Sequence, residues 1–444
     1  MKLWQKNKAI DQAIETFTIG QDRELDLQIA RFDVLGSLAH VQMLVHINLL
    51  TNAEGDLLQT ELRQLYQQAV QGTLLIEEGV EDIHSQVEQL LTMRLGEVGK
   101  KIHSGRSRND QVLLDLRLYF RSEIKELVEL TQTLFDLLQK QSERYQAVLM
   151  PGYTHMQVAM VSSFGLWFGA YAESLAEDLQ MLLAAYQLIN QNPLGSAAGY
   201  GNSFPLNRKM TTDLLGFDDL CYNAIHAQMS RGKTESHLAY AVSSLAMTLN
   251  KLAMDICLFS NQNYAFIQLP DEMTTGSSIM PHKKNPDVFE LIRGRCNQLM
   301  ALPNSIAMLC SNLPSGYHRE FQLLKEQLFP AIQQMKTCLQ MTSHAMGHLQ
   351  VNQQILDDPA YQYLYSVEVV NEKVLEGVAF RDAYQEVKKA IESGQFQYEG
   401  AIEHSHEGSI GNLSTQEIGQ KMDRVVEAFG FEKVEAKLGI LVTE

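Results

Sequence analysis

Residues 111–145 read QVLLDLRLYFRSEIKELVELTQTLFDLLQKQSERY and contain neither glycine nor proline. Apolar side chains recur in this stretch at steps of three, four and seven residues, namely Leu113, Leu116, Phe120, Leu127, Leu134 and Leu138. Such steps place the side chains on one face of an α-helix. The stretch therefore predicts one very long helix that packs through a single apolar face.

Outside this stretch, helical periodicity continues, whereas the alternation typical of strands is scarce. We expect four more long helices, the third of them kinked at Pro303, at residues 157–190, 233–264, 286–312 and 319–350. A chain of 444 residues has room for about three domains. The predicted fold is all-α, with an N-terminal helical domain at 1–105, a central long-helix bundle at 106–355 and a C-terminal helical domain at 356–444.

Three stretches contain no Asp, Glu, Lys or Arg, namely residues 145–172, 179–207 and 296–317. A helix that lacks a charged face is normally buried on all sides. Several such helices, each ~40 Å long at ~1.5 Å per residue, form a bundle that is too apolar for one subunit to cover. The charge pattern therefore predicts a homo-oligomer.

The composition narrows the class of protein. With 36 basic and 53 acidic residues the net charge is −17, which argues against a nucleic-acid partner. The five cysteines include no CxxC pair, which argues against a disulfide framework or a zinc site and for a reducing compartment. Residues 1–8 lack the apolar core of a signal peptide, and no 18 consecutive residues are all apolar. We therefore expect a cytoplasmic protein that does not span a membrane.

Residues 276–286 read Gly-Ser-Ser-Ile-Met-Pro-His-Lys-Lys-Asn-Pro and combine hydroxyl, ammonium and amide groups without apolar periodicity. Asn285 is expected to cap a helix that starts at Pro286 and continues with Asp287 and Glu290, acids suited to its positive end. A helix start of this kind binds anions, which favours a substrate that carries a carboxylate. Taken alone, the segment is better explained as a Gly/Ser loop with solvated lysines.

Residues 102–112 hold two arginines and an asparagine just before the long helix. Arg106 and Arg108 can grip carboxylates through paired hydrogen bonds, and Asn109 adds a neutral donor. A capped helix start with solvated arginines is the alternative.

Residues 151–157, Pro-Gly-Tyr-Thr-His-Met-Gln, place His155 inside the first charge-free stretch. We expect apolar surroundings there, in which the pKa of His155 is easily moved and its proton easily exchanged. A histidine on an apolar stretch is more often a core residue, but Thr154 and the Pro151-Gly152 turn favour a functional role.

Two further segments are richer in polar groups or glycine than a packed helix needs. The glycines of residues 192–205 allow a ligand to approach the backbone closely, but no strand precedes them and the dinucleotide-binding order is absent. In residues 314–325, Tyr317, Gln322 and Lys325 lie within about two helical turns and could face one pocket. An interhelical loop and a polar helix start are the alternatives.

Together these segments resemble the fumarase/aspartase superfamily and, within it, the argininosuccinate lyase branch. Residues 276–286 are similar to the superfamily signature. The segments that point to the branch are residues 33–37, 81–84, 105–111, 151–155 and 377–381. The similarity spans roughly residues 22–385.

The resemblance implies an all-α, three-domain subunit whose central helices form a twenty-helix core in a homotetramer, with each active site assembled from three subunits. It also implies reversible cleavage of argininosuccinate into arginine and fumarate, the last step of arginine biosynthesis, without cofactor or metal. The alternatives are another fumarate-releasing lyase, such as adenylosuccinate lyase or aspartase, and a catalytically silent structural homologue of the δ-crystallin kind.

The resemblance also assigns roles to residues. Ser277, on a mobile loop, removes a carbon-bound proton, His155 protonates the departing nitrogen, and Glu290 stabilises the charged imidazole; the reverse assignment of Ser277 and His155 stays open. Lys283 and Asn285 stabilise the doubly charged intermediate. The implied substrate-binding residues are Arg108, Asn109, Thr154, Tyr317, Gln322 and Lys325.

The chain departs from the family pattern in four places. Residues 233–237 lack an arginine that the family often has, and residues 18–22 lack a serine that contacts the substrate. His282 stands where glutamine is common, and residues 404–409 match only loosely. These departures bear on the substrate contacts more than on the type of reaction.

Overall fold

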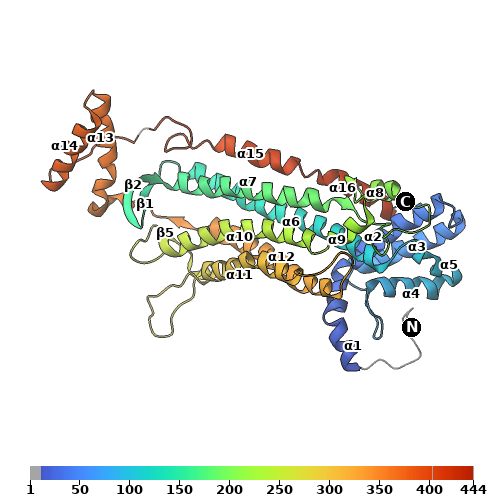
Figure 1. The fold of residues 1–444 in the computed structure, drawn as a ribbon. Helices are drawn as coiled ribbons and strands as arrows, with labels where there is room; N and C mark the ends of the chain where they lie inside the picture. Colours follow the sequence, from blue (N-terminus) through green and yellow to red (C-terminus); the bar gives the residue numbers. More distant parts are fainter. Residues whose placement is uncertain (1–11, 403, 444) are drawn as a thin grey trace.

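A computed structural model describes residues 12–402 and 404–443, so the expectation for residues 1–8 lies outside the described part. Long helices lie side by side in one elongated bundle, with shorter helices at both ends (Figure 1). Helices dominate the described chain and its strands are short. The prediction of an all-α fold is confirmed.

The helices follow one another in the order α1 (Gln12–Ile19), α2 (Asp22–His46), α3 (Asn52–Val70), α4 (Ile83–Leu95), α5 (Glu97–Lys100), α6 (Arg108–Arg144), α7 (Phe164–Ile189), α8 (Arg208–Leu214), α9 (Ala224–Met229), α10 (Lys233–Phe259), α11 (Asp287–Leu309), α12 (Leu323–His348), α13 (Ser366–Leu375), α14 (Phe380–Glu392), α15 (Thr415–Glu427) and α16 (Phe431–Thr443). The short 3-10 helices are η1 (Lys101–His103), η2 (Asp271–Met273), η3 (Arg319–Gln322), η4 (Ile355–Asp357) and η5 (Pro359–Tyr365).

The strands form three two-stranded pairs within the described residues. In chain order they are β1 (Leu149–Thr154), β2 (Gln157–Ser163), β3 (Gln191–Asn192), β4 (Asp219–Leu220), β5 (Ile267–Gln268) and β6 (Gln350–Val351). β1 pairs with β2 and β5 with β6 in antiparallel fashion, whereas β3 and β4 are parallel.

The predicted very long helix is confirmed as α6. Ser107 caps its start: the Ser107 hydroxyl accepts from the backbone N–H of Asn109, and the Asp110 carboxylate accepts from the N–H of Ser107. All six apolar residues that predicted its packing face are buried. Helix α6 therefore forms a central part of the core and contacts α2, α7 and α12.

The helix predicted at residues 157–190 is wrong over its first seven residues, which form β2. The backbone of β2 pairs with β1 instead of closing helical turns, and α7 begins only after Ser163, whose hydroxyl accepts from the N–H of Leu166. His155 and Met156 occupy the hairpin turn with positive φ values of 54° and 61°. A two-residue turn of that hand matches the twist of the paired strands.

The other long helices are confirmed, with shorter limits. Helix α10 ends at Phe259 because the Asn261 side chain accepts from the N–H groups of Asn263 and Tyr264 and folds the chain into a turn. The start predicted for α12 is instead the 3-10 helix η3. Pro303 lies inside α11, which continues through it.

The cap predicted for α11 is wrong. The helix begins at Asp287, Pro286 precedes it, and no side chain caps it. Asn285 instead pairs with Thr275 through two backbone hydrogen bonds of 2.9 and 3.2 Å. Asp287 and Glu290 lie in the first turn of α11, as expected.

The C-terminal part follows two courses. Helices α13 and α14 pack on each other around a small separate core of Val370, Ala383, Val387 and Phe396. Helices α15 and α16 instead return to the bundle, where α15 contacts α6 and α7 and α16 contacts α2 and α8. The domain limits at residues 105/106 and 355/356 stay a prediction.

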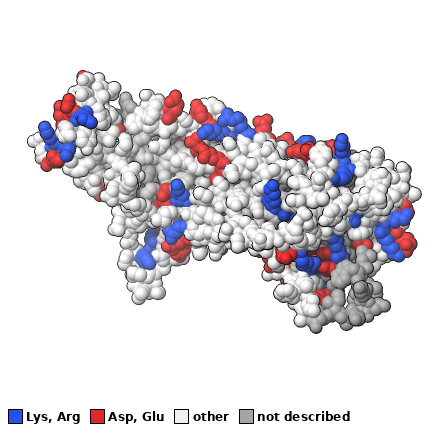
Figure 2. Space-filling model, viewed as in Figure 1, with Lys and Arg blue, Asp and Glu red and all other residues white. Residues whose placement is uncertain are grey.

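Apolar side chains remain exposed along the middle of the bundle. Tyr240 and Met247 on α10 are 54% and 61% exposed, and Leu291 and Met308 on α11 are 62% and 68% exposed. Figure 2 shows few charged side chains over the middle of the face in view and more toward its ends and upper edge. Among the described residues, one helix, α10, is long and apolar enough to cross a membrane. It packs against α7, α11 and α12, as a core helix does.

Candidate active site

The signature residues 276–286 form a loop that leaves the end of the bundle near β5 (Figure 1). The Thr275–Asn285 pairing closes its neck, and the Asn285 side chain donates to the Thr275 hydroxyl over 3.3 Å. A Cβ placed on Gly276 would meet no atom within 4 Å. The loop therefore has a defined base with open space beside Gly276, and Ile279 farther along it is 84% exposed.

The loop presents the polar groups that the sequence predicted. The Ser277 hydroxyl accepts from the backbone N–H groups of Ile279 and Met280 over 3.3 and 3.1 Å. The exposed Lys283 ammonium has no hydrogen bond or ion pair within the described part of the chain. Glu290 is exposed on the first turn of α11. A free ammonium on the same loop as a serine hydroxyl that accepts from two N–H groups can attract an anionic substrate.

His155 lies at the tip of the β1–β2 hairpin, at the same end of the molecule (Figure 1). His155 and Thr154 are both exposed. The expectation of apolar surroundings for His155 is therefore wrong for one protomer, because a hairpin turn carries its side chains away from the packed strands. The imidazole is therefore open to solvent.

The predicted binding residues Arg108 and Asn109 lie at the opposite end, where α6 begins. The Arg108 guanidinium donates to Glu81 over 3.0 Å and to the Ser85 hydroxyl over 2.6 Å, and it lies 3.3 Å from Asp82. It borders a cavity of about 310 Å³ that Glu81, Ser85, Glu88 and Lys100 also line. The guanidinium is thus held in place beside an open cavity.

Tyr317, Gln322 and Lys325 lie at this second end as well. Gln322 donates to the carbonyls of Thr18 and Ile19 over 3.2 and 2.7 Å. The Lys325 ammonium, with its side chain only 4% exposed, pairs with Asp22 and lies 2.5 Å from Asp26. Burial would lower the pKa of Lys325, but the attraction of Asp26 and Asp22 outweighs burial and raises it. Lys325 is therefore charged.

No single protomer brings the two groups of predicted residues together. Helix α10 runs between the two ends, and its 27 residues span about 40 Å. The structure collects Thr154, His155 and the signature loop at one end and Arg108, Asn109, Tyr317, Gln322 and Lys325 at the other.

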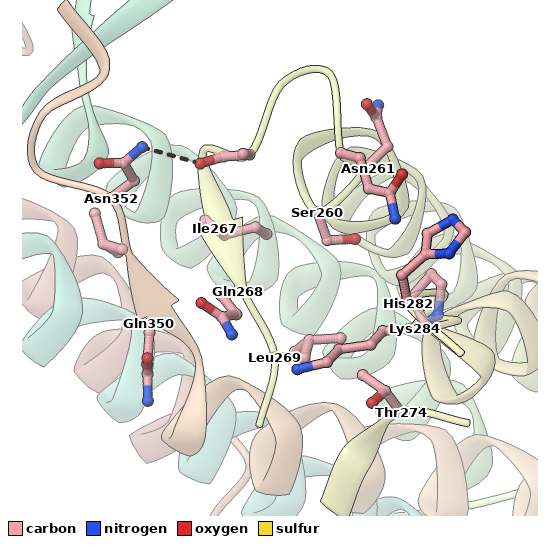
Figure 3. A pocket seen from close by; sticks show the side chains of 14 residues that line it. Ser260, Asn261, Ile267, Gln268, Leu269, Thr274, His282, Lys284, Gln350 and Asn352 are labelled. Atoms are coloured by element: carbon pink, nitrogen blue, oxygen red, sulfur yellow. Dashed lines mark hydrogen bonds between the residues drawn. The ribbon is translucent and has the colours of Figure 1, made fainter. Parts of the chain in front are cut away.

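A second cavity, of about 550 Å³, lies at the base of the signature loop (Figure 3). Amide and hydroxyl side chains make up half of its lining, which also contains His282, Lys284 and several apolar residues. These two residues alternate along the loop with Lys283 and Asn285. The Lys284 ammonium pairs with Asp271, so it is less free than that of Lys283.

The chain is similar to known lyases over nearly its whole length. Residues 5–301 match a protein family described as lyase. An argininosuccinate lyase from Parabacteroides distasonis is 59% identical over 433 residues, which cover 98% of this chain and 97% of that protein. Another from Thermotoga neapolitana is 38% identical over 386 residues, 87% of this chain and 97% of that protein. The chain belongs to the argininosuccinate lyase family.

Solved structures agree with this family assignment at the level of fold. An EDDS lyase variant with bound fumarate superposes with a TM-score of 0.76 at 22% identity, covering 98% of this chain and 97% of that one. A class II fumarase from Schistosoma mansoni gives 0.72 at 17% identity, with 94% of each chain covered. At such identities the likeness concerns the fold alone.

The part of the chain that the structure describes holds one group of side chains close enough to share a metal ion, namely Asp33, His84 and Asp115, all buried. His84 Nδ1 lies 2.7 Å from Asp33 and 3.5 Å from Asp115. Burial opposes the charged imidazole, but the two carboxylates outweigh it and raise the pKa of His84 to about 10. At neutral pH the imidazolium itself supplies the positive charge, so the cluster is a buried ion-pair network.

Sequence reasoning named Lys325 and Arg108 but missed the acids that hold them, Asp22, Asp26 and Glu81. A signal was present: Asp22, Asp26 and Asp33 recur at steps of four and seven residues on α2. Acids on one face of an otherwise buried helix need cationic partners.

Proposed function

We propose that the chain cleaves argininosuccinate reversibly into arginine and fumarate and is a carbon–nitrogen lyase of arginine biosynthesis. The observation that supports this most strongly is similarity to argininosuccinate lyases over 98% of the chain. The signature loop is consistent with it, because Ser277 and Lys283 lie exposed or half-exposed without competing ion pairs in the described residues.

The reaction removes a proton from a carbon beside a carboxylate and expels a guanidinium nitrogen. The carbanion spreads its charge into that carboxylate, and donors aimed at the growing charge lower the barrier. We assign this stabilisation to Lys283 and Asn285. Ser277 takes the proton, and its two N–H contacts favour the deprotonated hydroxyl. His155 protonates the leaving nitrogen, supported by Glu290.

The residues at the second end bind the substrate. Arg108 is oriented by Ser85 and Glu81, so a substrate carboxylate can accept from it at little cost in side-chain entropy. Asn109, Tyr317 and Gln322 add neutral donors at this end, and Thr154 adds one from the first end. Lys325 is a charged group that Asp22 and Asp26 hold in one position.

Because the two groups lie at opposite ends of the protomer, the proposal requires active sites shared between subunits, and the family resemblance makes the assembly a homotetramer with a twenty-helix core. The exposed apolar side chains of α10 and α11 provide a surface for such contacts. The five free cysteines agree with a cytoplasmic location. No nucleic acid or membrane takes part.

The direct test is release of fumarate, followed by its ultraviolet absorbance, from argininosuccinate. Ser277→Ala should abolish the signal while the helical circular dichroism stays unchanged, and the neighbouring Ser278→Ala is the matched control. A fully active Ser277→Ala contradicts the role of Ser277. Turnover of adenylosuccinate or aspartate in preference to argininosuccinate would favour another lyase of the superfamily. If none of these substrates is turned over, the chain is a catalytically silent homologue.

A second test addresses the shared site. His155→Asn and Lys325→Met should each be inactive as homotetramers. If each site draws on several subunits, tetramers reassembled from a mixture of the two variants contain some intact sites and regain part of the wild-type activity. Mixtures that stay inactive, although they form mixed tetramers, contradict shared sites.

A further inference from the structure

A third cavity, of about 330 Å³, lies where α16 covers α2, α3 and α6. It contains none of the residues proposed for the lyase reaction. Most of its wall is apolar and comes from the side chains of Phe32, Leu35, Leu118, Phe431, Val434 and Leu438. Its volume lies at the lower end of the range for small-molecule sites, about 300–1,000 Å³.

One side of the cavity carries a buried cation without an anion. Arg121 is 3% exposed, and its terminal nitrogens donate to the Asn190 side chain and to the carbonyls of Leu215 and Gly216 over 2.8 to 3.2 Å. Its Nε–H has no partner, and no carboxylate lies within ion-pair distance, among the described residues. Burial lowers the pKa of Arg121 to about 10. The ring centre of Phe217 lies 4.2 Å from the guanidinium carbon, and Asp218 attracts the charge from beyond Asn190, to whose side chain it is hydrogen-bonded. A buried charge is normally paired directly, and no anion contacts the guanidinium of Arg121 among the described residues.

Two further donors line the same cavity. The Tyr186 hydroxyl is buried and has no hydrogen-bond partner within the described part of the chain. Arg31 is half-buried, donates to the Ser122 hydroxyl over 3.1 Å and has no ion pair there either. The one carboxylate of the lining, Glu435, already pairs with Lys125. The polar side therefore offers donors and positive charge, and the rest of the wall offers apolar surface.

We propose that this cavity binds an amphipathic monocarboxylate, such as a medium-chain fatty acid or an arylalkanoic acid. The carboxylate accepts from Arg121 Nε and the Tyr186 hydroxyl, with Arg31 nearer the opening. The hydrocarbon part lies against Phe32, Leu118 and Leu438. Each buried CH₂ contributes about 0.8 kcal/mol. The proposal does not depend on the lyase reaction.

The test is titration calorimetry of the assembled protein with octanoate and 4-phenylbutyrate, with 1-octanol as an uncharged control. One carboxylate should bind per protomer, and octanol should bind at least about tenfold more weakly, a difference of 1.4 kcal/mol at 25 °C. The proposal is overturned if neither acid binds or if octanol binds equally well. In that case Arg121 Nε and the Tyr186 hydroxyl donate to ordered water instead.

Two variants locate the site. Leu438→Trp fills the cavity and should reduce the affinity for octanoate at least about tenfold, whereas Ala436→Trp, which places a tryptophan on the exposed side of α16, should not. Arg31→Met should weaken binding severalfold, and Arg63→Met, an α3 arginine outside the cavity, is its control. Fumarate release and melting temperature show whether each variant is folded. If both Leu438→Trp and Arg31→Met bind octanoate with unchanged affinity, the ligand does not bind in this cavity. If Leu438→Trp does not fold, the affinity of Arg31→Met alone decides whether the ligand binds there.

Discussion

The two ends of the bundle hold their functional side chains in opposite ways. At the signature-loop end, Lys283 and His155 are exposed and without ion pairs among the described residues. At the other end, Lys325 is almost completely buried between Asp22 and Asp26, and Arg108 is paired with Glu81. The groups of the first end make few contacts of their own, whereas those of the second end are held in place by neighbouring side chains of the same chain. Changes at the first end should therefore affect turnover alone, and changes at the second should also affect folding.

The largest effect on stability is expected for Lys325→Met. Removing the ammonium leaves Asp22 and Asp26 buried without their partner, which should lower the free energy of unfolding by about 3–5 kcal/mol. Urea denaturation followed by circular dichroism measures the change. Adding Asp22→Asn and Asp26→Asn should recover part of the loss. A Lys325→Met variant as stable as the parent would contradict the view that the second end is organised by buried charge.

Lys283→Met should act on turnover instead. Losing one donor aimed at the developing negative charge should reduce kcat by about 10²–10³-fold. The urea midpoint should stay where it is, because the side chain is exposed and unpaired in the described structure. A stability loss comparable to that of Lys325→Met would remove the contrast between the two ends.

The stability of His84→Gln relative to the parent should depend on pH, which tests the contribution of buried charge. The pKa of His84 is raised to about 10 in the folded chain, against about 6.5 when unfolded. Its charged form therefore adds stability that is fully present below about pH 6.5 and is lost as the pH rises through about 10. The variant should melt below the parent at about pH 7, and the gap should narrow toward about pH 10.5. A gap independent of pH contradicts a charged His84.

The smallest effect is expected for Lys284→Met, next to Lys283 on the same loop. In its ion pair with Asp271 the two side chains are 49% and 74% exposed, and exposed pairs contribute about 0–1 kcal/mol. Stability and kcat should both stay close to the parent values. A large loss of kcat would assign Lys284 a role that its pairing with Asp271 does not suggest.

Much of the fold was open to prediction from local pattern. The recurrence of Leu113, Leu116 and Phe120 predicted α6 because helical spacing and burial of one face are properties of a short segment. The β1–β2 hairpin was missed, since residues 157–163 are strand only through their pairing with residues 149–154. Asn285 is a second example. It was expected to cap α11, but it pairs with Thr275 across the loop, and this pairing does not follow from the local pattern.

By itself the sequence determined the helical class, the exposed polar loop and the family, because these depend on residue type and spacing along one chain. Only the tertiary structure decided that Lys325 faces two aspartates of α2, that His84 lies between Asp33 and Asp115, and that the proposed catalytic groups stand at the opposite end of the molecule from most of the proposed substrate-binding residues. Charge pairing and burial depend on side chains from distant segments, and their distances arise only when the helices pack.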